Sequence, residues 1–84
     1  MKGYQLNMYK LCMILNENGT EIKQYLKNKV ITVVSYTVGG NFSFVDISTG
    51  QSYTVRENII GVCFDNGFLV IKNEKSTYCC MALG

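Results

Sequence analysis

Hydrophobic and polar residues alternate along most of this chain in short segments, and turn residues separate the segments. The turns recur roughly every eight to twelve positions, as in small all-β proteins. They are rich in Asn, Gly, Asp and Ser and lie at residues 16–19, 39–41, 48–51, 65–67 and 73–76. We therefore expect a mainly β protein, a small antiparallel barrel or sandwich of about six to seven strands.

The individual segments fit this expectation. Residues 4–15 begin with alternation and end apolar on both faces, as a strand does when it runs from a sheet edge into a core. Residues 30–38 are the richest in β-branched and aromatic side chains, which favour strands. Further strands are predicted at residues 42–47, 52–55 and 77–83, the first two joined by a hairpin at Thr49-Gly50.

The clearest turn in the chain is Asn66-Gly67. It stands between two apolar runs in the stretch VCFDNGFLVI. Asn followed by Gly is the pair that best tolerates the positive φ angles of a type I′ turn. The sequence therefore predicts a tight β-hairpin here.

One stretch favours a helix over a strand. Apolar residues are spaced i, i+3 and i+4 from Ile22, Thr20 is a candidate N-cap, and lysines follow late in the stretch. We expect a helical turn or short helix near residues 20–28. A strand paired to residues 9–15 is the alternative. The rhythm of turns and strands is similar to that of SH3-like and other small barrels, a likeness of architecture that implies no function.

Composition places the chain among globular proteins of one domain. It has 84 residues, 48% of them hydrophobic, a net charge of +2, and no proline. Neither a repeat nor a linker-like stretch divides it, so we expect a single domain over residues 1–84. We see no targeting segment and no apolar run near the length of a membrane span, which favours a cytoplasmic protein without a membrane partner.

Four cysteines raise the question of disulfides, metal or reactivity: Cys12, Cys63, Cys79 and Cys80. A cytoplasmic chain keeps its thiols reduced. No histidine and no C-x2-C pair is present, so we expect neither a zinc site nor another cofactor. On a strand, Cys79 and Cys80 point to opposite faces, which favours a structural role. Whether either of them is exposed and oxidisable stays open.

The chain contains few of the residues and motifs that catalysis usually requires. Histidine is absent, a nucleophilic cysteine lacks its usual partner, and no phosphate-binding glycine motif occurs. Asp46 is the one acid within an apolar strand segment. We interpret it as a hydrogen-bond acceptor that organises the adjacent turn, and we expect a non-catalytic protein.

Binding of a protein is the main functional hypothesis. Residues 30–55 contain a single charge, Asp46, so their edges and faces lack the usual protection against association. We expect a homo-oligomer, a protein partner, or both, with the interior of a closed barrel as the alternative explanation. The bias toward Asn, Lys, Ile and Tyr is common in phages and mobile elements, which suggests an accessory, inhibitory or assembly factor.

Single-stranded nucleic acid is the alternative ligand. Small barrels bind it through aromatic residues on the sheet with basic residues around them. The candidate residues here are Lys23, Tyr25, Lys27, Lys29 and Arg56. A net charge of +2 and a sequence pI of 8.4 are low for such a protein, so this hypothesis ranks second. A small-ligand pocket within an oligomer is a third hypothesis, which no sequence feature specifically supports.

Overall fold

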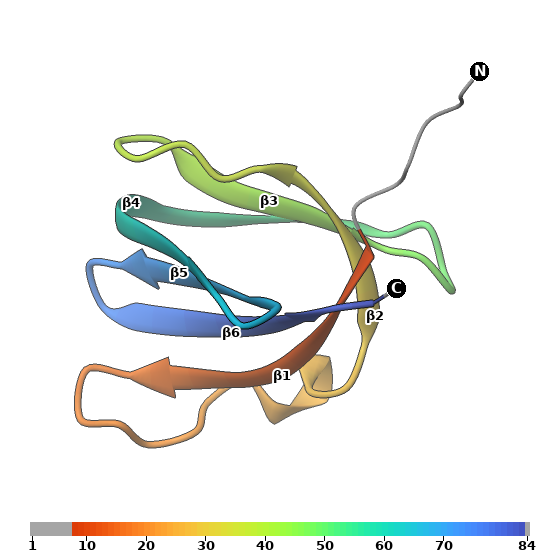
Figure 1. The fold of residues 1–84 in the computed structure, drawn as a ribbon, viewed down its shortest axis with the longest axis horizontal. Coiled ribbons are helices and arrows are strands. Elements are labelled where there is room, and N and C mark those ends of the chain that lie inside the picture. Colours follow the sequence, from red (N-terminus) through yellow and green to blue (C-terminus); the bar gives the residue numbers. More distant parts are fainter. Residues whose placement is uncertain (1–7, 84) are drawn as a thin grey trace.

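Six antiparallel strands close into a barrel in the computed structural model, which describes residues 8–83 (Figure 1). The strands are β1 (Met8–Asn16), β2 (Val30–Ser35), β3 (Asn41–Asp46), β4 (Ser52–Asp65), β5 (Phe68–Asn73) and β6 (Ser76–Ala82). Each strand pairs with the next along the chain, and β6 returns to pair with β1. The predicted fold class, a small antiparallel barrel, is confirmed.

Two strands differ in extent from the sequence prediction. Residues 52–55 are the first part of β4, which runs on to Asp65, pairs with β3 and then with β5, and shifts register between Ile59 and Gly61. Strand β2 ends at Ser35, before the predicted end, because the following loop turns onto β4, where the Gly39 amide donates to the Ile59 carbonyl at 2.8 Å. Residues 4–7 of the first predicted strand lie outside the described residues.

The hairpin between β4 and β5 has the predicted turn. Asn66 and Gly67 both adopt positive φ angles, 49° and 81°. Two consecutive positive φ values define the type I′ geometry, whose twist matches that of the flanking strands. This local prediction is therefore confirmed.

The stretch predicted as a short helix contains one 3-10 turn, η1 (Gln24–Leu26). Thr20 is not its N-cap, because the chain still follows β1 until Ile22, whose amide donates to the Ile14 carbonyl. The cap position is Lys23, in the left-handed region at φ 53°. The helical turn is thus confirmed, while the cap prediction was wrong. Among the described residues, no helix has the length and apolar character needed to cross a bilayer.

The barrel interior is packed around aromatic rings. The Phe42 ring lies 5.1 Å from that of Phe44 and 5.2 Å from that of Tyr78, measured between centroids. Side chains of β1, β2, β4 and β5 fill the space around them, and the largest fully buried ones are aliphatic: Leu11, Ile31, Ile59, Leu69 and Ile71. Burial of these groups is the main favourable term for a fold of this size.

Candidate functional site

Three of the five candidate nucleic-acid residues meet at one pocket, and two do not. Lys23, Tyr25 and Arg56 line the same depression. Lys27 instead forms an ion pair with Glu21 at 2.9 Å, and Lys29 forms one with Asp46 at 2.9 Å. The basic cluster expected from sequence is therefore smaller in space than along the chain.

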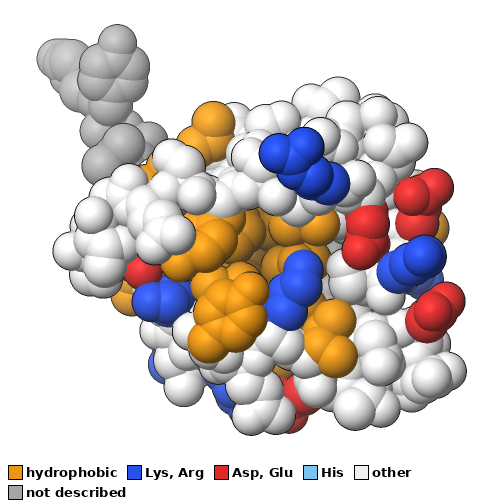
Figure 2. All heavy atoms as spheres, turned by 180° about the vertical axis from the view of Figure 1, so that it is seen from behind, with side chains coloured by type: hydrophobic (Ala, Val, Ile, Leu, Met, Phe, Trp, Pro, Cys, Tyr) orange, Lys and Arg blue, Asp and Glu red, His pale blue; other side chains and the backbone are white. Residues whose placement is uncertain are grey.

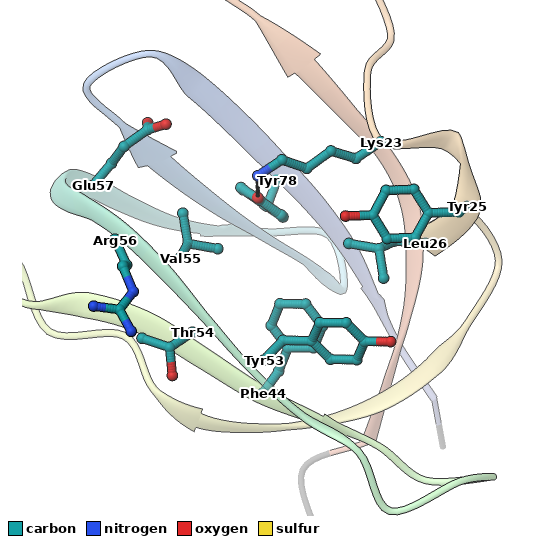
Figure 3. A pocket seen from close by; sticks show the side chains of 10 residues that line it. All are labelled: Lys23, Tyr25, Leu26, Phe44, Tyr53, Thr54, Val55, Arg56, Glu57 and Tyr78. Carbon is teal, nitrogen blue, oxygen red and sulfur yellow. Dashed lines mark hydrogen bonds between the residues drawn. The ribbon is translucent and has the colours of Figure 1, made fainter.

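This depression, which we call the aromatic–basic pocket, has a volume of about 260 Å³. Its lining combines aromatic, basic and small side chains: Lys23, Tyr25, Leu26, Phe44, Tyr53, Thr54, Val55, Arg56, Glu57 and Tyr78 (Figure 3). On one face of the molecule, hydrophobic side chains gather around a hollow and Lys and Arg side chains lie beside it (Figure 2). Barrel closure brings η1 next to β4, so residues distant in sequence share this site.

Two tyrosines provide ring surfaces in the pocket. Tyr25, on η1, has 70% of its surface exposed. Tyr53, on β4, stacks on the buried Phe44 ring, with 5.1 Å between centroids and 15° between planes. In Figure 3 Tyr25 lies on one side of the pocket and the stacked pair of Tyr53 and Phe44 on another. Such aromatic surfaces are suited to contact with another planar ring.

Lys23 holds its charge over the inner end of the pocket. Its ammonium donates to the Tyr78 hydroxyl at 2.9 Å and lies 5.5 Å from the centroid of that ring. Burial lowers the pKa of Lys23, but the hydrogen bond to Tyr78 and the electrostatic effects of Tyr78, Tyr25 and Glu57 together outweigh burial, so the pKa is raised and the charge retained. Burial raises the pKa of Tyr78, which keeps the hydroxyl protonated.

Arg56 is the second cation of the pocket, and its charge is available. Within residues 8–83 its guanidinium has neither an ion pair nor a side-chain hydrogen bond. The neighbouring carboxylate of Glu57 accepts instead from the Lys75 amide at 3.0 Å and from the Ser76 hydroxyl at 3.3 Å. Glu57 also points away from Arg56 in Figure 3.

A second surface lies on the outside of four neighbouring strands. In antiparallel pairs, directly opposed residues share a face. The register therefore aligns outward side chains from β4, β5, β6 and β1 in a central row, Cys63, Val70, Cys79 and Met13. A parallel row contains Phe68 and Met81. We call these six residues the outer apolar face; Phe68 is 39% exposed and Met13 36%.

Two lysines border the outer apolar face. Lys10 lies opposite Met81 in the row of Phe68, and Lys72 lies opposite Thr77 in the row on the other side. Neither ammonium has an ion pair among the described residues. The face is thus an uncharged centre with Lys72 on one side and, in the row of Phe68, Lys10 at one end and Asp65 at the other.

A third feature is a patch where the end of β2 and the loop after it meet β4. It consists of Val34, Tyr36, Val38, Val62 and Phe64, around a depression of about 540 Å³. Val34 is 64% exposed and Phe64 59%. We call it the β2–β4 patch. It lies near Met8, the first described residue, which pairs with Thr32 of β2.

Groups with candidate acid or thiol chemistry are engaged in structure. The Asp46 carboxylate accepts from Lys29 and from the amide and hydroxyl of Ser48, and these bonds lower its pKa to about 2. The predicted turn-organising role of Asp46 is confirmed. Cys79 and Cys80 do lie on opposite faces, and burial raises the pKa of the Cys80 thiol to about 12. In residues 8–83, no three acidic or thiol side chains group as metal ligands.

Comparison with known proteins gave no match among family models, curated proteins or solved structures. The candidate sites therefore stand on the geometry of this chain alone. Sequence reasoning found Lys23, Tyr25 and Arg56, but Tyr53, which joins them in the pocket and stacks on Phe44, was not among its five candidates, and it missed the outer apolar face. A signal for that face was present, because residues 68–71 and 78–83 are apolar on both strand faces.

Proposed function

We propose that this protein is non-catalytic and acts by binding another protein on its outer apolar face, as an accessory, inhibitory or assembly factor. The observation that carries the proposal is the central row of Cys63, Val70, Cys79 and Met13. Antiparallel sheets with one solvated face normally carry polar residues there. When strands carry apolar residues on both faces, one face packs in the barrel interior and a partner can cover the other.

The outer apolar face is smaller than a complete interface. Its six positions, on strands about 4.8 Å apart with rows spaced by two residues, cover about 200 Å². A stable interface covers about 800 Å² on each partner. The partner's contact therefore extends beyond the apolar centre to the two bordering lysines.

Charge indicates the chemistry of the partner. With Lys10 and Lys72 on opposite sides of the face, the best complement is an apolar strip flanked by carboxylates. A second copy of this chain would bring four lysines together across the interface against only two carboxylates, one Asp65 from each copy. We therefore favour a different protein, and the homo-oligomer expected from sequence stays a prediction.

The same proposal includes a cytoplasmic setting and no catalysis. Cysteines on the surface, among them the exposed Cys63, are compatible with a reducing compartment. The buried Cys80 thiol, with its raised pKa, is a poor nucleophile. An origin in a phage or mobile element stays a prediction from composition.

The test uses two matched lysine substitutions. Val70→Lys places a charge in the centre of the outer apolar face, and Val45→Lys places one on an outward position of β3, between Thr32 and Ser52. A partner captured from source cells is purified and recombined with each variant. We expect Val70→Lys to weaken the reconstituted complex at least tenfold and Val45→Lys to leave it unchanged, with circular dichroism confirming that both fold.

Three results would overturn the proposal. Equal binding by Val70→Lys and wild type removes the face as the site, and loss only in Val34→Lys moves the site to the β2–β4 patch. A dimer of the purified chain that Val70→Lys dissociates makes a second copy the occupant. If Val70→Lys fails to fold, Met13→Gln at the end of the same row replaces it.

A further inference from the structure

The aromatic–basic pocket is a second candidate site, separate from the outer apolar face. Its ring surfaces and cations come from two segments: Lys23 and Tyr25 from η1 and the residue before it, and Tyr53 and Arg56 from β4. In Figure 3 Lys23, Tyr25 and Tyr53 lie around one open space, and Arg56 lies at its edge with the guanidinium turned away from the two rings. No residue of this pocket belongs to the outer apolar face, so the two sites can be tested independently.

Several of the side chains are held in place before any ligand binds. Tyr53 rests on the buried Phe44 ring. Lys23 adopts a left-handed backbone conformation that is unfavourable for a lysine, and its ammonium is fixed by the Tyr78 hydroxyl. Non-glycine residues in this region are enriched at ligand sites. Preorganisation of this kind reduces the entropy lost on binding.

The free charges favour an anion. Arg56 has no acidic partner in the described part of the chain, because Glu57 binds the Lys75 amide and Ser76. A guanidinium binds phosphate or carboxylate oxygens with two parallel hydrogen bonds. The exposed ring of Tyr25 and the half-buried ring of Tyr53 favour a planar group beside that anion.

The number of free cations limits the ligand to one unit. Lys27 and Lys29, which would extend a basic track, are neutralised by Glu21 and Asp46. A volume of about 260 Å³ lies at the lower end for small-molecule sites. We propose that the pocket binds one planar ring carrying one anionic group, the chemistry of a single nucleotide, either free or as one unit of a single strand.

Three probes separate the two parts of this ligand: adenosine monophosphate, adenosine, and ribose 5-phosphate. The full-length protein is titrated with each by calorimetry, and amide chemical shifts locate the binding. We expect saturable binding of the nucleotide. Adenosine and ribose 5-phosphate should each bind at least about tenfold more weakly, because base stacking and one charge-assisted hydrogen bond each change the affinity by about that factor. Adenosine binding as tightly as the nucleotide, or no saturable nucleotide binding, would overturn the proposal.

Two substitutions then test the residues. Arg56→Gln and Tyr25→Ala should each lower nucleotide affinity about tenfold. Both side chains are exposed, so the melting temperature should not change. Lys72→Gln is the control for Arg56→Gln, since it removes the same charge from the outer surface. If Arg56→Gln and Lys72→Gln lowered the nucleotide affinity equally, the cause would be the net charge of the protein and the assignment of the site would be wrong.

A single-stranded oligonucleotide distinguishes the two sources of the ligand. If the nucleotide comes from a strand, the oligonucleotide binds more tightly than the mononucleotide and Arg56→Gln weakens both. If it is free, the two probes bind alike. Contact with one phosphate predicts a shallow salt dependence, with a slope of about −0.7. A third outcome is that the oligonucleotide binds with a steep salt dependence that neither Arg56→Gln nor Tyr25→Ala changes. That result would place its binding on another surface and overturn the assignment of the pocket.

Discussion

The two halves of the barrel have similar interiors and different exteriors. Outward positions of β2, β3 and the first part of β4 include five Ser and Thr residues beside the exposed Val30 and Val34: Thr32, Ser35, Ser43, Ser52 and Thr54. Ser43 and Thr54 lie close enough to share a hydrogen bond, at 3.3 Å. In the corresponding positions of the other half, the central row consists of Cys, Val and Met. The hydroxyl-rich half is suited to water, and the other half is suited to a partner.

We propose that this difference serves binding and not the fold itself. Both halves bury the same kind of inward side chain, for example Phe42 on β3 and Leu69 on β5, each with no exposed surface. Outward side chains contribute little to stability unless something covers them. The apolar character of one exterior is therefore better explained by binding than by folding.

The largest effect is expected at the interior that both halves share. Phe42→Ala removes a ring that contacts Phe44 and Tyr78, and such a change costs about 3–5 kcal/mol. That loss approaches the whole stability of a domain of this size. Urea denaturation should show a largely unfolded variant in buffer. A loss below about 1 kcal/mol would contradict the packing described here.

A smaller effect, dependent on pH, is expected at the end of the hydroxyl-rich half. Hydrogen bonds from Lys29 and then Ser48 lower the pKa of Asp46 from 3.8 to about 2. A carboxyl whose pKa is lower in the folded state stabilises it above its unfolded pKa, and this contribution disappears as the pH falls. The melting temperature of the wild type should therefore fall more steeply between pH 3.8 and about 2 than that of Asp46→Asn.

Lys29→Gln provides the control for the Asp46 prediction. It removes the main cause of the lowered pKa, so the folded and unfolded pKa values of Asp46 come closer together and the fall in stability below pH 3.8 should be smaller than in the wild type. Parallel pH profiles for wild type and Asp46→Asn would show that this ion pair does not contribute to acid stability.

Thiol reactivity should separate the outer and inner faces of the apolar half. Cys63 is exposed, whereas Cys80 has no exposed surface and burial raises its pKa to about 12. The thiolate is the reactive form, so iodoacetamide at neutral pH should label Cys63 first and Cys80 only through unfolding. Mass spectrometry of digests measures the order. Denatured, non-reduced protein should show four free thiols, and fewer would contradict the reduced state.

Features that depend on neighbouring residues in the chain were predictable from sequence, whereas the alignment of side chains across neighbouring strands was not. Asn66-Gly67 forms the predicted hairpin because both residues act within one turn. The central row through Val70 and Cys79 depends instead on the register of four strands, including a shift between Leu11 and Met13. No local pattern determines such a register.

The candidate pocket shows the same limit. Sequence proximity grouped Lys23 with Lys27 and Lys29, but in space these two lysines meet acidic partners. Barrel closure brings Lys23 to Tyr78, 55 residues away, and to the same pocket as Arg56. Residue types were therefore predictable, while the ion pairs that select among them were set by tertiary contacts.

The smallest effects on stability are expected for one substitution on each exterior, and these two substitutions test the comparison most directly. Val45 and Val70 both point outward from central positions and are both half-buried, but Val45 lies between Thr32 and Ser52, whereas Val70 lies between Cys63 and Cys79. Val→Thr keeps the β-branched shape and replaces a methyl group by a hydroxyl. In the free protein we expect both substitutions to change the free energy of unfolding by less than about 0.5 kcal/mol.

Binding should distinguish the same two substitutions. If the outer apolar face is covered in a complex, Val70→Thr leaves a hydroxyl buried without a partner and weakens the complex by about 1–3 kcal/mol, whereas Val45→Thr has no effect. Calorimetry with the reconstituted partner measures both. A clear loss of stability in free Val70→Thr alone would instead mean that this half needs its apolar exterior to fold. The apolar side chains would then be structural, and the contrast between the halves would no longer point to a partner.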